Sequence, residues 1–427
     1  MKNRREFLKK ATTASLAVLP ITTWGEQGHQ FTLEEVKTAG HYYKEEDYWK
    51  AIRLQFPLDQ SQTYFNNGTI GPMPGYVLNK VIDHMRYYAI HGAEIDYKGN
   101  GQELLTGYFK YESLRERIGE MVNAEMKEIV LTQNATFGMN YVANGLNLKA
   151  GDEIINTDQE HGGGFAAWQL LANRKGCVYK QAKLTMPAND PEVLLQAVLK
   201  EITSKTKVIA IPHIISVYGV VMPVKEICAE AKRKGIFTIL DGAQAVGQIM
   251  VDVQDIGCDA YYSSLHKWLL APAGSGILYI HKDRMPEIWS TIASYNWDFE
   301  EDHGFRLMQN GTGNPGVLAG MEAAVDFYQQ IGPERWTSRI KFLGDYLREG
   351  LKMNKKISIH SSIHAAMCAG MTTYALDGMT GPELQNTFWT KGKMQPRSVG
   401  QELLRHCVHI YNNKEEIDRA LNILSTL

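Results

Sequence analysis

The chain has 427 residues, which is long enough for a large core and for two domains. It is 44% hydrophobic and 22% charged, the composition of a soluble globular protein and not of a disordered or collagen-like one. Its 45 basic residues nearly balance its 47 acidic ones, so the charge gives no indication of a nucleic-acid partner. The five cysteines form no CxxC pair and predict no disulfide framework.

The first 25 residues are expected to be an export signal and not part of the fold. A basic cluster precedes an uncharged apolar stretch at 11–23, which is typical of a secretory signal. Residues 3–9, NRREFLK, resemble the bacterial twin-arginine motif, which the export machinery recognises as an address. The apolar stretch is short for a membrane span. We expect export to the bacterial periplasm through the twin-arginine machinery, without a stable membrane anchor; the alternative is a cytoplasmic protein with a basic amphipathic start.

From residue 128 onward, short apolar runs alternate with amphipathic helical stretches, which predicts an α/β fold with a mostly parallel sheet. Proline and glycine mark the helix ends: one helix begins after Asp190, and another begins after Pro223 and stops before Gly235. The candidate strands are 128–132, 153–157, 207–211, 237–240, 260–263 and 276–280.

A cluster of turn-forming residues at 310–316, NGTGNPG, precedes a long helical pattern and indicates a change of domain. The last hundred residues mix helices with strand-like runs at 372–375 and 408–411, which fits a smaller α+β domain. The expected organisation is a signal segment at 1–25, an N-terminal arm at 26–75 that joins the small domain, a large domain at 76–316 and a C-terminal small domain at 317–427.

Lys267 is the most informative residue, because it follows a predicted strand inside the largely apolar run 263–276, SSLHKWLLAPAGSG. Burying an ammonium group is costly unless its charge is paired or removed. Formation of an imine with an aldehyde removes the charge, and desolvation makes the neutral amine a nucleophile. The position therefore favours a lysine that bonds covalently to an aldehyde.

Asp241 stands at the end of an apolar strand, where ligands bind in open α/β sheets. A carboxylate at that place can pair with a protonated pyridine nitrogen, although a helix cap or a structural salt bridge would explain it equally well. His161 precedes three glycines, which would let a ligand lie close to the backbone under the imidazole. A single histidine before a glycine run more often has no functional role, and this alternative stays open.

A phosphate site is indicated by Ala135 and Thr136, which follow the strand 128–132 and begin a helical stretch. Free N–H groups at a helix N-terminus and a hydroxyl suit a phosphate, and ordinary N-capping is the alternative. Ser264 and His266 flank Lys267 and could complete the site.

Taken in this order, the motifs resemble those of the class V aminotransferase family, which are fold-type I enzymes dependent on pyridoxal 5'-phosphate (PLP), over nearly everything after residue 55. The resemblance implies a seven-stranded-type sheet in the large domain beside the smaller α+β domain. It also implies that Lys267 holds PLP and moves protons, that Asp241 pairs with the ring nitrogen, that His161 stacks on the ring as the second catalytic residue, and that Gln244 hydrogen-bonds the phenolic oxygen.

The same resemblance assigns the phosphate to Ala135, Thr136, Ser264 and His266. Thr312 resembles a residue that the family contributes from the partner subunit, which implies a homodimer with shared active sites.

For the substrate, Arg405 resembles the arginine that grips the α-carboxylate, and a bidentate guanidinium suits that group. Asn67 lies in a loop, YFNNGTIGP at 64–72, that resembles the family loop next to the active site, so it is expected to bind substrate. The resemblance implies a small amino-acid substrate whose amine displaces Lys267, followed by epimerisation, transamination or elimination at the α-carbon.

Two alternatives remain. Desulfurases of the family need a cysteine in an Arg-x-Gly-His-His-Cys-like loop; here 391–399, KGKMQPRSV, keeps Arg397 but has no cysteine, which disfavours a cysteine desulfurase or selenocysteine lyase. The whole pattern is more similar to the isopenicillin N epimerase-like branch. The other alternative is a non-catalytic binding protein, against which the retained Lys267 argues. No metal site is predicted, because the histidine pairs 360/364 and 406/409 lack the other ligands.

Overall fold

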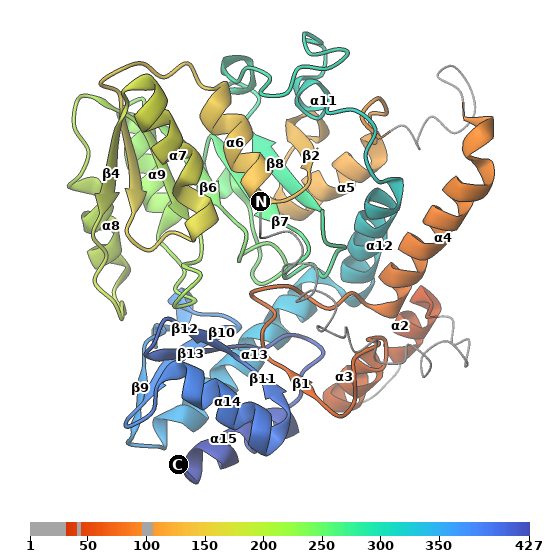
Figure 1. The fold of residues 1–427 in the computed structure, drawn as a ribbon, viewed down its shortest axis with the longest axis vertical. Coiled ribbons are helices and arrows are strands. Elements are labelled where there is room, and N and C mark those ends of the chain that lie inside the picture. The colour runs from red at the N-terminus through yellow and green to blue at the C-terminus, as the bar shows by residue number, and fades with distance from the viewer. Residues whose placement is uncertain (1–30, 41–43, 96–105) are drawn as a thin grey trace, which may run out of the picture.

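The structure is a computed structural model that describes residues 31–40, 44–95 and 106–427. The expected signal segment at 1–25 lies outside these ranges. Figure 1 shows a large α/β part in the upper half of the view and a smaller part, formed by the C-terminal residues, below it. Within the described ranges, no helix combines the length and apolarity needed to cross a membrane.

The large part is built on a seven-stranded sheet with the strand order β2-β8-β7-β6-β5-β3-β4. Only β8 runs antiparallel to its neighbours, so the predicted mostly parallel α/β sheet is confirmed. The strands are β2 (Ile129–Thr132), β3 (Glu153–Thr157), β4 (Val178–Ala182), β5 (Thr206–Pro212), β6 (Phe237–Asp241), β7 (Ala260–Ser264) and β8 (Gly276–Ile280).

Helices connect these strands, and two of them begin or end at the residues that the sequence predicted. Asp190 caps α8 by accepting a hydrogen bond from Glu192 N, and Pro191 takes the first helical position. The helix α9 ends before Gly235, whose φ of +66° suits glycine. The helices of this part are α5 (Glu112–Val122), α6 (Ala135–Gly145), α7 (Gly162–Lys175), α8 (Pro191–Leu199), α9 (Val224–Arg233), α10 (Val253–Ile256) and α11 (His303–Leu307).

Two long helices, α4 (Gly75–His91) and α12 (Pro315–Ile331), lie side by side at the right of Figure 1. The helix α12 begins directly after the turn cluster, with Asn314 as its N-cap. Its buried side chains belong to the same hydrophobic cluster as the large sheet. The helix therefore packs with the large part, although it follows the turn cluster in sequence.

The small part contains a four-stranded sheet of order β12-β13-β10-β9, antiparallel throughout. The N-terminal arm joins it, since β1 (Thr63–Tyr64) pairs in parallel with β11 (Met394–Gln395). The other strands and helices of this part are β9 (Ile357–Ile359), β10 (Met371–Leu376), β12 (Arg397–Val399), β13 (Leu403–Cys407), α13 (Pro333–Lys352), α14 (Gly381–Gly392) and α15 (Lys414–Ser425). The first two helices of the arm, α2 (Leu33–Ala39) and α3 (Glu45–Arg53), bury their side chains in the hydrophobic cluster of the large part.

The strand expected at 372–375 is confirmed as β10, whereas the one expected at 408–411 is wrong. The strand there is β13, five residues earlier in the chain, and its polar residues Arg405 and His406 hide it from a hydrophobicity pattern. The apolar residues 408–411 are buried in a loop that leaves the sheet. Their apolarity reflects packing and not strand formation.

His406 is a neutral histidine in the core of the small part. Its ring lies 5.0 Å from Phe65 and from Phe388, and stacks on Tyr374 at 5.6 Å between centroids. Neither ring nitrogen has a hydrogen-bond partner among the described residues. Burial lowers the pKa of His406 to about 3, so the folded protein keeps this ring uncharged at any moderate pH.

We predict that His406→Phe protects the fold against acid. The unfolded chain takes up a proton on this histidine below about pH 6.5, and the folded chain does not until about pH 3, so the histidine costs stability as the pH falls between these values. The difference in the free energy of unfolding between the variant and wild type should therefore be roughly 2 kcal/mol more in favour of the variant at pH 5 than at pH 7.5. Urea unfolding of both proteins at both pH values measures this difference. The exposed His364→Gln is the control, and an equal response of both variants would contradict the prediction.

Candidate active site

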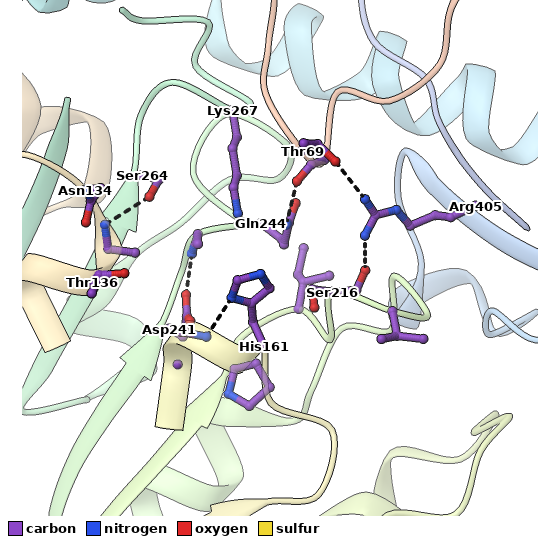
Figure 2. A pocket seen from close by; sticks show the side chains of 18 of the residues that line it. Thr69, Asn134, Thr136, His161, Ser216, Asp241, Gln244, Ser264, Lys267 and Arg405 are labelled. Atoms are coloured by element: carbon purple, nitrogen blue, oxygen red, sulfur yellow. Dashed lines mark hydrogen bonds between the residues drawn. The ribbon is translucent and has the colours of Figure 1, made fainter. Parts of the chain in front are cut away.

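The carboxyl ends of the parallel strands meet at one edge of the large sheet, where the chain encloses a cavity of about 510 Å³. The strand β6 ends at Asp241 and β7 ends at Ser264, three residues before Lys267. The small part closes the cavity with residues 397–400 and Arg405, and the N-terminal arm contributes Gly68 and Thr69. Figure 2 shows the side chains that converge on it.

Most of the site residues expected from the sequence line this one cavity. They come from segments more than two hundred residues apart in the chain, which the sheet edge brings together. The expected residues in the lining are Ala135, Thr136, His161, Asp241, Gln244, Ser264, His266, Lys267 and Arg405.

Asn67 and Thr312 do not line the cavity. Thr312 is exposed on the turn before α12. Asn67 is fully buried and both ends of its amide are used: Nδ2 donates to the Lys267 carbonyl at 3.2 Å, and Oδ1 accepts from the Tyr411 hydroxyl at 3.1 Å. The expectation that Asn67 binds substrate is therefore not supported, because its amide positions the Lys267 backbone instead.

The Lys267 side chain extends into the cavity toward Asp241 and His161 (Figure 2). The N-terminal arm fixes its backbone, because the Gly71 amide donates to the His266 carbonyl at 2.8 Å and Asn67 holds the Lys267 carbonyl. Burial lowers the pKa of the Lys267 amine, and the Asp241 carboxylate acts in the opposite direction. A lowered pKa increases the fraction of neutral, nucleophilic amine.

Asp241 is held with its carboxylate toward the cavity. Its Oδ1 accepts from the Ala243 amide at 2.8 Å, and the Tyr262 hydroxyl bonds to the same carboxyl group. Burial raises the pKa of Asp241, while the Ala243 N–H and the Lys267 charge lower it. A cation placed against this carboxylate, such as a protonated pyridine nitrogen, would relieve the cost of its burial.

A second carboxyl group lies behind Asp241. A side chain added at Gly164 would approach Asp241 Oδ2 at 3.2 Å and Glu160 Oε2 at 3.6 Å, so both carboxyl groups face the same backbone position. Burial raises the pKa of Glu160 to about 8, and its Oε1 accepts from the backbone and hydroxyl of Thr157. Sequence reasoning missed Glu160, although it directly precedes His161.

His161 caps α7: its Nδ1 accepts from the Gly163 amide at 3.1 Å. An acceptor Nδ1 leaves the ring proton on Nε2. Burial and the neighbouring Lys267 charge lower the pKa of His161. The imidazole is therefore a neutral flat ring at the cavity wall, as stacking on an aromatic ligand requires.

The phosphate end of the cavity lies at the start of α6. Asn134 caps this helix through Phe137 N at 3.2 Å, and Ser264 Oγ accepts from Ala135 N at 2.9 Å, which leaves the Ser264 hydroxyl proton free for a ligand. His266 lines the same end of the cavity, and its Nδ1 is buried there without a hydrogen bond of normal geometry to the described residues, although the Ser275 backbone lies near the ring. A helix N-terminus, a free hydroxyl proton and an orphaned ring nitrogen together suit a phosphate group.

Gln244 has a defined amide orientation. Trp268 Nε1 can only donate, and it donates to Gln244 Oε1 at 2.7 Å. The Nε2 group therefore lies on the other side, where it donates one hydrogen to the Gly68 carbonyl at 2.9 Å. Gln244 lines the cavity and its second amide hydrogen makes no bond to a described residue, which is compatible with the phenolic-oxygen contact that the resemblance implies.

Arg405 presents an incompletely satisfied guanidinium, although only 6% of its surface is exposed. Nη1 donates to the Ser216 carbonyl at 2.5 Å, and Nη2 lies 3.5 Å from Thr69 Oγ1. Nε is buried without a partner among the described residues. A buried cation that bonds only neutral groups is suited to an anionic ligand.

The sequence model of the family described as Aminotransferase class-V matches residues 63–420. Isopenicillin N epimerase of Streptomyces clavuligerus is 26% identical over 397 residues, which cover 89% of this chain and 98% of that protein. A probable cysteine desulfurase of Xylella fastidiosa (strain 9a5c) is 28% identical over 414 residues, which cover 88% of this chain and 94% of that protein.

Among solved structures, the cystine C-S lyase C-DES in complex with cysteine persulfide is similar, with a TM-score of 0.78 and 27% identity over 87% of this chain and 99% of that one. A mutant of C-DES with glycine covalently linked to its PLP cofactor matches with the same TM-score of 0.78 and 26% identity, covering 87% of this chain and 98% of that one. The residues around Lys267 fit this cofactor, because the lining offers groups that would complement its polar atoms: Asp241 for the ring nitrogen, Gln244 for the phenolic oxygen, and the α6 N-terminus with Ser264 and His266 for the phosphate.

We predict that Ser264→Ala weakens binding of PLP and leaves binding of pyridoxal, which lacks the phosphate, unchanged. A hydrogen bond to a charged group contributes about 1.5–3 kcal/mol, so the dissociation constant for PLP should rise about tenfold or more. Titration of cofactor-free protein by absorbance measures both ligands. Ser275→Ala, which removes a buried hydroxyl outside the lining, is the control. Equal losses for the two ligands would refute the phosphate assignment.

Proposed function

The chain belongs to the class V aminotransferase family of PLP-dependent enzymes, and on this premise we propose that it removes the α-proton of an amino acid, with epimerisation, transamination or elimination as the outcome. The single observation that carries the proposal is that the buried Lys267 amine lies in the same cavity as the Asp241 carboxylate and the Arg405 guanidinium, both close enough to shift its pKa. Bound PLP supplies an electron-withdrawing ring that delocalises the electron pair left at the α-carbon.

The protein's own residues have separate tasks in this proposal. Arg405 binds the α-carboxylate through its guanidinium group, which lines the cavity and bonds only neutral oxygens, and this fixes the α-carbon in the cavity. Lys267 accepts the α-proton, since burial favours its neutral form. Asp241 would keep the ring nitrogen of bound PLP protonated, and the neutral His161 would cover its ring. Return of the proton to the α-carbon would make the enzyme an epimerase, the activity named for the Streptomyces clavuligerus relative.

The alternative of a cysteine desulfurase has a specific weakness. No cysteine is present in the described lining of the cavity, and the loop 391–399 contains none. Cys407 is fully buried behind Gly68, where a side chain on that glycine would meet its Sγ at 2.9 Å. Cys368 donates to the His364 carbonyl on another loop. Among the described residues that line the cavity, a persulfide-forming reaction therefore has no thiol to receive the sulfur.

Two further proposals concern the setting of the enzyme. A homodimer is supported by the exposed apolar face of α4, which includes Ile82, Met85 and Ile90, and by Thr312, which is exposed outside its own cavity. Export to the periplasm is supported by the sequence of residues 3–9 alone. Sedimentation of the purified protein and fractionation of bacterial cells check these two proposals.

The proposed reaction is tested by exchange of the α-proton. The protein is incubated in D2O with D- and L-amino acids, and proton NMR follows the α-proton signal while chiral chromatography identifies the products. We expect exchange for at least one amino acid, and its loss in Lys267→Ala. Retention of the α-proton in every amino acid whose addition alters the cofactor absorbance would contradict the proposal.

We also predict that Arg405→Gln lowers kcat/KM for amino acids about 100-fold, because a buried charge-assisted pair with the carboxylate is lost. Simple amines without a carboxylate should change the cofactor absorbance of the variant and of wild type with similar affinity. Stopped-flow absorbance with alanine and ethylamine makes the comparison. Unchanged kinetics with alanine would place carboxylate recognition elsewhere.

A further inference from the structure

A second arginine stands directly opposite Arg405. In the antiparallel pair of β12 and β13, Arg397 is the cross-strand partner of Arg405. Opposite residues in such a pair point to the same face, with their Cβ atoms about 4.5–5.5 Å apart. Both arginines line the cavity. The register therefore places two guanidinium groups together on the face of the small sheet that closes the active site.

Like charges placed opposite each other destabilise a sheet, so an anion is expected to compensate. The chain does not provide one within its described residues: neither arginine forms a salt bridge there, and Asp241, the acidic residue of the lining, ends the strand β6 of the large sheet. The side chain of Arg397 also makes no hydrogen bond to a described residue. The compensating charge must then come from the ligand or from solvent.

The two arginines lie at different depths. Arg405 is 6% exposed, lines the cavity and is anchored by the Ser216 carbonyl, so its guanidinium group serves a ligand group deep in the cavity. Arg397 is exposed on the edge strand β12, and the residues that follow it, 398–400, also line the cavity. A single carboxylate on Arg405 would leave the outer guanidinium without a partner.

We propose that the substrate carries a second carboxylate at the end of its side chain, and that Arg397 binds it. This inference rests on the proposed function, in which Arg405 holds the α-carboxylate. Arg397 is then a specificity residue that selects acidic amino acids or their longer analogues over neutral ones. Arg405 thus binds the α-carboxylate, which all amino acids share, and Arg397 binds the side-chain carboxylate, which distinguishes this substrate.

The test compares acids with their isosteric amides. Aspartate and asparagine, and glutamate and glutamine, each in both chiral forms, are titrated into the PLP-loaded enzyme, and the change in cofactor absorbance gives the dissociation constants. For at least one pair we expect the acid to bind about tenfold tighter than its amide, since one member makes a charge-assisted bond to Arg397. Arg397→Gln should remove this ratio by weakening the acid and leaving the amide unchanged.

Two controls sharpen the result. Arg397→Lys keeps the charge and should retain part of the preference, whereas Lys355→Gln removes an exposed charge outside the cavity lining and should leave the ratio intact. The proposal is overturned if acids and amides bind alike in wild type, or if Arg397→Gln weakens both members of a pair equally, which would assign Arg397 to the α-carboxylate. A failure of the proposed function would give a different result: in the D2O experiment, amino acids would bind to the enzyme but keep their α-protons.

Discussion

The cost of burying the Lys267 amine is the constraint on which the site depends. An ammonium group in this position needs a compensating charge, which the Asp241 carboxylate supplies. Burial acts in the opposite direction and lowers the pKa of the lysine. The parallel sheet makes this arrangement possible, because β6 and β7 are neighbours and end at the same edge. Covalent attachment of an aldehyde removes the charge altogether, so the same burial that is costly in the free protein favours the loaded one.

The cavity is completed by close contacts between segments that are distant in sequence. A Cβ at Gly71 would lie 2.2 Å from the Lys267 carbonyl oxygen, and a Cβ at Gly68 would lie 2.9 Å from Cys407 Sγ. Only glycine permits the N-terminal arm to approach both the lysine loop and β13 so closely. The arm thereby couples the large sheet to the small one, and brings Gln244 and Arg405 within reach of the same loop.

The sequence was sufficient to predict the parts of the fold in which local pattern and final structure agree. The buried parallel strands are continuous apolar runs, and Asp190 with Pro191 marks the start of α8. The edge strand β4 was not predicted, because VYKQA is half polar and partly exposed. Strand β13 was displaced in the prediction because Arg405 and His406 interrupt its apolarity, and a ligand or an aromatic cluster, not the local pattern, explains why they are there.

The same distinction holds for the site. Lys267 and Asp241 could be predicted because a charged group in or after an apolar run requires a reason, whereas Arg405 was expected only from the resemblance to the family. The positioning role of Asn67, the second carboxyl group of Glu160 and the pairing of Arg397 with Arg405 could not, because each depends on contacts that only the folded chain creates.

The central claim is that the Lys267 amine bonds covalently to the aldehyde of PLP. The most direct measurement is reduction of the PLP-loaded protein with borohydride, followed by proteolysis and mass spectrometry of the peptides. We predict that the reduced cofactor is found on Lys267, in the peptide that contains His266 and Trp268. An unmodified Lys267, with the cofactor released or attached to another lysine, would contradict the account.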